Sequence, residues 1–302
     1  YVVVEDLDLS AYGNRVPQFS FEVVRPAQGQ GAAASPGLSS IIPGVCLIPG
    51  TGEYTLATTP VHYAKGFSKG RSANVNTITG KTDFQSSLDQ LTDELPNCGM
   101  VSLVASWFAG DLRCASCEIQ PKVEQKLEDG VSMKWRVSDV TRSQAAEIQK
   151  LNGRSVYGGT PTDQSIVEAI TALKSAGKDV TFYPFILMDQ LPGNTLPDPW
   201  TGTIGQPALP WRGRITLNHA PGQPGSADAT AAADSEVAAF FGTCQPSDFS
   251  LVNQKVTYSG PQEWSYRRFI LHYAHLCKAV GGVAAFCIGS EMRALTQVRG
   301  TS

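Results

Sequence analysis

Short apolar runs of strand length recur along the chain and alternate with stretches of helical periodicity. These runs lie at 101–108, 154–157, 180–187 and 283–289. Runs of this length and composition are typical of parallel strands that are buried on both faces. The pattern therefore predicts four parallel strands that are separated by helices.

Helices are predicted where apolar residues repeat every three or four positions between suitable end signals. The clearest start signal is Thr160-Pro161-Thr162-Asp163, which offers an N-cap, a proline at the first helical position and an acid in the first turn. Gly177 is placed as the residue that ends this helix. The predicted helices are 84–95 (with Thr82 as N-cap), 143–151, 160–177, 229–241 and 261–280.

Strands that alternate with helices define an α/β fold, and two architectures remain open for it. Four strands are half of a (β/α) TIM barrel, with long insertions in the loops that follow the strands. They equally suit an open doubly wound sheet. No Gly-x-Gly-x-x-Gly or phosphate-binding loop occurs, which disfavours the nucleotide-binding form of that sheet.

Composition divides the chain into three parts. Residues 1–25 read as two strands with a turn between them. Residues 26–49 read as a linker, because 26–40 consist largely of Gly, Ala, Pro, Ser and Gln. Residues 50–302 have the pattern of a large globular domain. Since Tyr1 already lies in strand-like sequence without a signal peptide before it, we expect the chain to be part of a longer polypeptide.

Charge and cysteine content exclude some functions. A net charge of −3 and a pI near 5.8 give no basic face for sequence-specific nucleic-acid binding, and the apolar runs are too short to span a membrane. Seven cysteines suit thiols in a reducing compartment. Cys114-Ala-Ser-Cys117, with Cys98 upstream, is the one metal-like spacing, and a lone pair of this kind is a weak signal. We therefore expect no metal and no cofactor.

The strand ends carry the candidate chemistry. Carboxylates there can act as acid, base or nucleophile, and aromatic rings can stack on the apolar faces of sugars. Glu291 and Asp189 are the candidate catalytic carboxylates; the candidate sugar-binding residues are Trp107, Trp200, Trp211, Arg212 and Arg293. Each also has a structural interpretation: Asp189 as a loop cap, the tryptophans as anchors of a long loop, and Glu291 with Arg293 as a solvated ion pair.

Four longer motifs resemble one family. They are VYGGTPTDQSIVEAI at 156–170, VTFYPFILMD at 180–189, PWTGTIGQPALPWRGRIT at 199–216 and CIGSEMRALT at 287–296. With them, residues from about 50 to 302 resemble the glycoside-hydrolase TIM-barrel-like domain of the megatron family, the large tail-tip proteins of gene transfer agents and tailed phages. Separately, VVEDLDLSAYGNRVPQFSFEV at 3–23 is similar to a stretch of phage tail-hub and baseplate proteins, where it belongs to a β-rich module.

The resemblance implies a barrel of which this chain holds only the first half, preceded by a short β segment of a tail-hub module. It implies a place in the tail of a virion-like particle that is assembled in the bacterial cytoplasm. The implied partners are other hub and baseplate proteins, two further copies in a homotrimer, and glycan of the host surface or peptidoglycan. Glu291 matches the acid/base carboxylate of barrel glycosidases, although Ser290 stands where many of them carry Asn.

Three functions follow as hypotheses. The barrel is an architectural or glycan-binding part of a tail baseplate, or it is an active glycosidase that cuts peptidoglycan or capsule, or the chain is a cytosolic sugar-active enzyme. The hub-like segment at 3–23 argues against the third. Ser290 favours the first over the second, because Ser cannot supply the donor that Asn directs toward a sugar hydroxyl.

Overall fold

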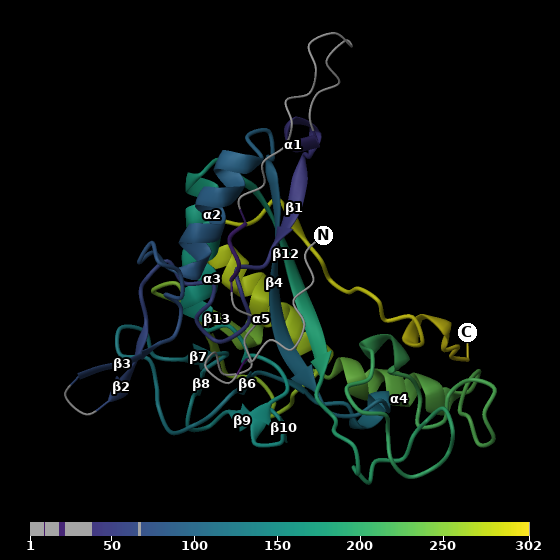
Figure 1. The fold of residues 1–302 in the computed structure, drawn as a ribbon. Helices are drawn as coiled ribbons and strands as arrows, with labels where there is room; N and C mark the ends of the chain where they lie inside the picture. The colour runs from purple at the N-terminus through teal and green to yellow at the C-terminus, as the bar shows by residue number, and fades with distance from the viewer. Residues whose placement is uncertain (1–8, 10–17, 22–37, 66–67, 302) are drawn as a thin grey trace.

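The computed structural model describes residues 9, 18–21, 38–65 and 68–301, and its centre is a parallel sheet (Figure 1). Four strands follow one another in the order β1-β4-β12-β15, and β5 pairs with β4 in the antiparallel sense. Their bounds are β1 Gly44–Leu47, β4 Met100–Ala109, β5 Ile119–Gln120, β12 Asp179–Met188 and β15 Ala285–Phe286. The predicted strands at 101–108 and 180–187 are confirmed, whereas the one at 283–289 is reduced to two residues.

Strand order decides between the two architectures. In a doubly wound sheet the order reverses at a switch point, and helices cover both faces. Here the spatial order of the four parallel strands equals their order in the chain, and α2, α3 and α5 lie on one side of the sheet (Figure 1). This is the winding of a barrel. The described α/β structure therefore corresponds to a partial TIM-like fold.

The main helices form where the periodicity predicts them, with differences at their ends. They are α2 Asp83–Glu94, α3 Asp163–Ser175, α4 Ala231–Phe241 and α5 Tyr266–Ala279. The Thr82 hydroxyl accepts from the Gln85 amide at 3.2 Å, as a cap should. The cap of α3 is Thr162 rather than Thr160, and α5 starts after Ser265 rather than at 261. Gly177 follows α3 at a φ of 71°, which is the left-handed conformation expected there.

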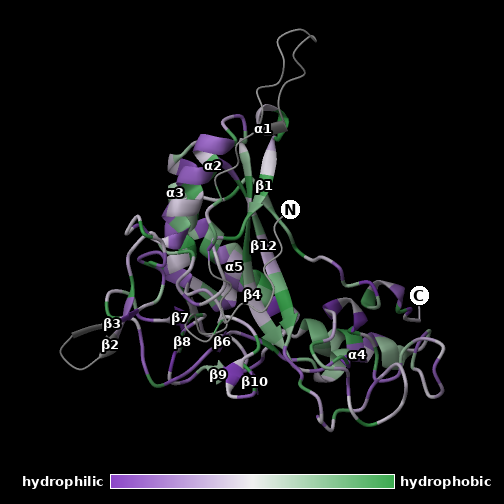
Figure 2. Cartoon of the chain, in the orientation of Figure 1, coloured by the Kyte–Doolittle hydropathy of each residue, from purple (hydrophilic) through white to green (hydrophobic). Residues whose placement is uncertain are grey.

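The two faces of β4 and β12 have different environments. Leu103, Trp107 and Phe182 point toward the helices and are fully buried. Val104 and Tyr183 point to the opposite face and are only half-buried. Figure 2 shows that β4 and β12 are apolar over much of their length. Because side chains alternate along a strand, such runs supply apolar residues to both faces of the sheet. One face is the core; the other corresponds to the inside of a barrel.

The predicted helix at 143–151 is wrong, and so is the place of the strand at 154–157. Short strands β10 (Lys150–Leu151) and β11 (Arg154–Ser155) form a hairpin outside the parallel sheet. Asn152 and Gly153 make its turn with φ of 52° and 77°. Asn-Gly favours such two-residue turns, so local turn chemistry overrides the weak helical spacing.

The remaining elements are short. They are α1 Leu38–Ile41, β2 His62–Lys65, β3 Ser68–Ser72, η2 Cys114–Ser116, β6 Lys122–Val123, β7 Arg136–Val137, β8 Val140–Thr141, β9 Ala146–Glu147, η3 Arg212–Arg214, η4 Pro246–Asp248, β13 Phe249–Val252, β14 Lys255–Tyr258 and η5 Leu295–Gln297. None of the described helices has the length and apolar content to cross a bilayer.

The N-terminal predictions are largely outside the described residues. Of the predicted β segment at 1–25, the structure describes residues 9 and 18–21, and of the predicted linker at 26–49 it describes the second half, 38–49. Residues 18–21 carry no strand, and Phe19 stacks on Phe21 with ring centroids 5.9 Å apart. The range 26–49 is not linker throughout, because β1 pairs residue by residue with the start of β4.

The carboxylate of Glu263 joins the end of α4 to the start of α5. It accepts from the amides of Thr243 and Cys244 and from the hydroxyls of Thr243 and Ser265. Partial burial alone would raise the pKa of Glu263, but these donors outweigh it and lower the pKa from 4.5 to about 2. The ionised form therefore stabilises this junction.

We predict that Glu263→Gln lowers the free energy of unfolding at pH 7 by about 1 kcal/mol, because one charge-assisted acceptor is weakened. The folded-state pKa lies below the unfolded-state value, so this contribution is complete above pH 4.5 and is lost as the pH falls toward 2. Urea unfolding of both proteins across this range measures it. Glu118→Gln, at an exposed position, is the control. A difference between wild type and Glu263→Gln that stays constant with pH would contradict the prediction.

Candidate functional site

Glu291 lies just beyond β15 in an unusual backbone conformation. Its φ is +56°, in the left-handed region that residues with a Cβ adopt rarely. Such conformations cost about 1–3 kcal/mol and are concentrated at functional sites. The side chain is 49% exposed. The strand therefore ends by presenting a carboxylate to solvent at the mouth of the sheet.

Two neighbouring residues of the long loop after β12 hold this carboxylate. Trp211 donates from Nε1 to Glu291 Oε2 at 2.7 Å, and Arg212 forms an ion pair with Glu291 Oε1 at 3.2 Å. Neither donor can accept a hydrogen bond, so both Glu291 oxygens act as acceptors. The structure thus brings together three of the predicted site residues.

Arg212 is the centre of this cluster, and it is 5% exposed. Its guanidinium donates to Ser290 Oγ at 3.1 Å and to Tyr183 Oη at 3.2 Å, and Nε donates to the Ser290 carbonyl at 3.3 Å. It also stacks on the Phe185 ring at 3.7 Å. Ser290 and Tyr183 share a further hydrogen bond. One buried cation therefore ties the end of β15 to the open face of β12.

A tight turn keeps Trp211 in place. A Cβ on Gly213 would lie 2.5 Å from the Trp211 ring, so only glycine fits at this position. The Gly213 carbonyl also accepts from the Ala294 amide at 3.0 Å, which links η3 to the segment after Glu291. The two segments that form the cluster are thus joined by backbone as well as side-chain contacts.

A cavity of about 370 Å³ opens beside the cluster on the half-buried face of the sheet. Its floor includes Val104, Ser106, Tyr183 and Leu187, and Glu291 lies at its edge. The walls are the loops 48–52 and 157–161. Its size is in the range of small-molecule sites, and its position at the strand ends is that of barrel active sites.

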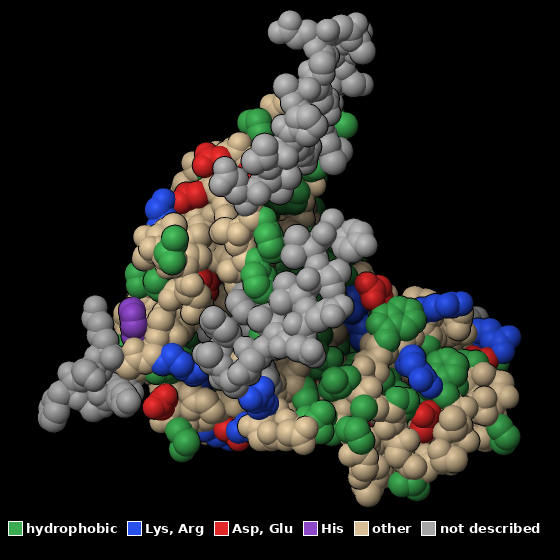
Figure 3. Space-filling model, in the orientation of Figure 1, with side chains coloured by type: hydrophobic (Ala, Val, Ile, Leu, Met, Phe, Trp, Pro, Cys, Tyr) green, Lys and Arg blue, Asp and Glu red, His purple; other side chains and the backbone are tan. Residues whose placement is uncertain are grey.

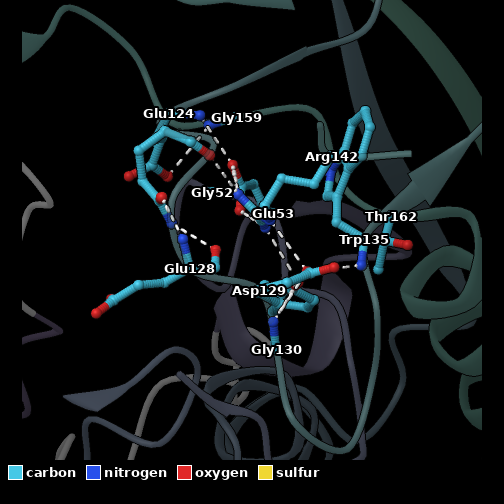
Figure 4. A network of polar contacts seen from close by, with 12 residues as sticks. Gly52, Glu53, Glu124, Glu128, Asp129, Gly130, Trp135, Arg142, Gly159 and Thr162 are labelled. Atoms are coloured by element: carbon cyan, nitrogen blue, oxygen red, sulfur yellow. Dashed lines mark hydrogen bonds and ion pairs between the residues drawn. The ribbon is translucent and has the colours of Figure 1, made fainter. Parts of the chain in front are cut away.

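A buried polar network fixes the loop that follows β1 (Figure 4). Glu53 is fully buried; its carboxylate pairs with Arg142 and accepts from the Glu124 amide at 2.8 Å. Arg142 also pairs with Asp129 at 3.0 Å, and Tyr54 donates to Asp129 at 2.7 Å. The network therefore holds one wall of the cavity through interactions outside the parallel sheet.

Two glycines let the two walls meet. A Cβ on Gly158 would lie 2.5 Å from the Gly52 nitrogen, and one on Gly159 would lie 2.5 Å from Glu53 Cγ. These close approaches explain the Gly-Gly pair in a loop that otherwise carries bulky residues.

Asp189 does not join Glu291. It is 1% exposed, and both of its oxygens accept from Lys122 Nζ, at 2.9 and 2.8 Å. The Gln149 amide adds a third contact at 3.3 Å. Asp189 follows β12 as predicted, but it is the acidic half of a buried ion pair rather than a free carboxylate.

The other predicted sugar-binding residues also have structural surroundings. Trp107 is fully buried against Trp264 and Phe269 on the helix side of the sheet, so it has no surface to offer a ligand. Trp200 donates to the Arg214 carbonyl at 2.9 Å and anchors its loop. Arg293 is exposed and follows Glu291 on the segment toward η5.

The Cys-x-x-Cys pair has the properties of structural thiols. Burial raises the pKa of the Cys114 thiol to about 12, and the pKa of Cys117 is raised further. Such thiols stay protonated at neutral pH and are poor nucleophiles. Within the described ranges, no group of three or more His, Cys, Asp or Glu side chains is arranged to hold a metal ion.

Sequence reasoning missed Tyr183, Phe185 and Tyr157, which all line the cavity. The apolar run at 180–187 hid the first two, because a strand buried on both faces shows no alternation. A signal was present: Tyr183 and Phe185 are two residues apart and so share one face of the strand. Knowing which face is open required the sheet order.

Glu291 also borders a second hollow, which is almost wholly apolar. It measures about 710 Å³, and its lining includes Phe240, Phe241, Tyr266, Ile270, Ile288 and Leu295. Figure 3 shows apolar side chains gathered around α4. The Tyr266 hydroxyl donates to the Ile288 carbonyl at 2.6 Å, which fixes the backbone between β15 and Glu291.

Part of the chain matches the model of a known family. Residues 264–302 match the model of the GTA TIM-barrel-like domain. The matched segment includes α5, β15 and Glu291 with its neighbours, so it coincides with one side of the site. It supports a gene transfer agent TIM-barrel-like domain. No curated protein matches the chain.

We predict that Arg212→Leu lowers the free energy of unfolding by about 3–4 kcal/mol, because it removes the one cation that Ser290, Tyr183 and Glu291 share. Arg293→Leu, the same change two residues after Glu291 at an exposed position, should stay within about 0.5 kcal/mol of wild type. Urea titrations measure both. If both variants lost the same free energy of unfolding, Arg212 would not be the centre of the cluster.

A second matched pair tests Asp189. Asp189→Asn leaves the buried Lys122 ammonium without its counter-charge, and we expect a loss of about 3–5 kcal/mol. Asp179→Asn, at the exposed start of the same strand, should change stability by less than about 0.5 kcal/mol. Thermal and urea unfolding give both values. A stable Asp189→Asn protein would contradict the structural role of this carboxylate.

Proposed function

We propose that the chain is a component of the tail tip of a gene-transfer-agent-like particle, acting in host-cell attachment or envelope penetration and DNA delivery. In this role the barrel-like domain is architectural or binds cell-surface glycan. The family match at 264–302 and the motif at 3–23 support a place in the tail of such a particle. The cavity on the open face of the sheet supports glycan binding.

One observation favours binding over cutting. Glu291 is the one acidic residue among the described residues that line the cavity. Glycoside cleavage needs two carboxyl groups, about 5–5.5 Å apart for retention or about 6.5–9.5 Å apart for inversion. The other candidate catalytic carboxylate, Asp189, is buried in its ion pair with Lys122. The described residues thus offer an acceptor for sugar hydroxyls without the second group that hydrolysis requires.

The alternative is an active glycosidase with Glu291 as acid/base. The strained backbone of Glu291 and its exposure beside a cavity favour this reading. A nucleophile would then have to come from outside the described residues.

The proposed assembly is a homotrimer around the tail axis, formed in the bacterial cytoplasm, with other hub and baseplate proteins as neighbours. The trimer is proposed because the motif at 3–23 resembles hub proteins. Closed cyclic symmetry is also the usual arrangement of oligomers that surround an axis.

Incubation with purified peptidoglycan separates binding from cutting. We predict that the 302-residue chain sediments with insoluble peptidoglycan but releases no reducing sugar, and that Glu291→Gln binds more weakly. Glu118→Gln is the matched control. Release of sugar by wild type but not by Glu291→Gln would establish the glycosidase instead. If neither protein binds or cuts, the domain is architectural.

A further inference from the structure

The charges around the cavity restrict what it can bind. Among its described lining residues, Glu291 is the one that carries a full charge. Arg212 lies directly behind the lining, stacked on Phe185 and paired with Glu291 at 3.2 Å. The negative and positive charges therefore compensate each other within the protein, and the cavity has no net charge to offer a ligand.

A charged ligand would lose hydration here without gaining a counter-ion. Taking an ion out of water is unfavourable unless a counter-charge compensates for the lost hydration. Both potential partners are already engaged: Arg212 with Glu291, Ser290 and Tyr183, and Glu291 with Trp211 and Arg212. An uncharged ligand that donates hydrogen bonds to Glu291 avoids this cost, since carboxylates keep acceptor capacity beyond two bonds.

The walls favour a ligand with apolar surface. Tyr157, Tyr183 and Phe185 contribute aromatic rings, and Val104 and Leu187 contribute aliphatic side chains. Aromatic rings pack against the C–H faces of a sugar, and the aliphatic side chains gain from burying a methyl group. Ser106 and Thr51 add hydroxyls that can bond to the ring substituents.

We propose that this cavity selects an uncharged sugar that carries a small apolar substituent, such as an acetamido group, and rejects acidic and amino sugars. The proposal rests on the glycan-binding function proposed above. An acetamido group combines an N–H donor, which suits the Glu291 carboxylate, with a methyl group, which suits the apolar wall.

Four sugars with the same ring test the proposal against the intact chain. They are N-acetylglucosamine, glucose, glucosamine and glucuronic acid, titrated separately and followed by saturation-transfer NMR and calorimetry. We expect N-acetylglucosamine to bind most tightly, with both charged sugars weaker by about tenfold or more. If either charged sugar binds as tightly, the selectivity is overturned while glycan binding stands. If none of the four binds, glycan binding fails, and the selectivity fails with it.

A matched pair of variants locates the effect. Ser106→Lys places a cation in the cavity floor, and the preference should shift from N-acetylglucosamine to glucuronic acid. Ser102 lies on the same face of β4, four residues earlier and outside the cavity lining, so Ser102→Lys should keep the wild-type order of affinities. Circular dichroism and unfolding curves check that both variants fold. If a folded Ser106→Lys protein keeps the wild-type order of sugar affinities, the proposal is contradicted. It is also contradicted if the preference for glucuronic acid rises equally in both variants.

Discussion

The pairing of β4 with β12 is the constraint on which the rest of the structure depends. Ten consecutive residues of each strand are in parallel register, from Met100 opposite Asp179 to Ala109 opposite Met188. Because side chains alternate, this register sends one set to the helices and the other to the open face. A slip of one residue would exchange Trp107 with Ser106 and place a tryptophan on the open face. The core and the cavity therefore both depend on this one register.

The site is attached to this sheet through side chains more than through strand pairing. β15 contributes only two residues, Ala285 and Phe286, opposite Thr181 and Phe182. The segment that carries Glu291 is held instead by hydrogen bonds from Tyr266 and Arg212 to its carbonyls. A residue held in this way can keep a strained φ, because the surrounding contacts fix its position despite the cost of that conformation.

The sequence predicted the elements whose period is long and unambiguous. β4 and β12 were found because each contains an apolar run of strand length, and α2 and α3 because their apolar positions repeat at helical spacing over three turns or more. The hairpin at Asn152-Gly153 was missed because two-residue strands have no measurable period. β1 was missed because its four residues follow a Gly- and Pro-rich stretch and resemble linker.

The site was predictable in part. Glu291, Trp211 and Arg212 were selected because they follow strands, and parallel strands end on one face. The same rule grouped Asp189 with them, but a sequence does not reveal that Lys122 pairs with it across 67 positions. It also misassigned Trp107, because residues within a strand belong to one face or the other and only the register decides which.

Thiol accessibility tests the two-faced sheet most directly. Cys46 pairs opposite Ser102 on the open face and is exposed, whereas Cys98 and Cys277 are buried on the core side. Iodoacetamide labelling of the native chain, mapped by mass spectrometry and normalised to the urea-unfolded rate, should modify Cys46 first and leave Cys98 and Cys277 protected by at least about a hundredfold. Equal protection of Cys46 and the two core cysteines would contradict an open, ligand-accessible face.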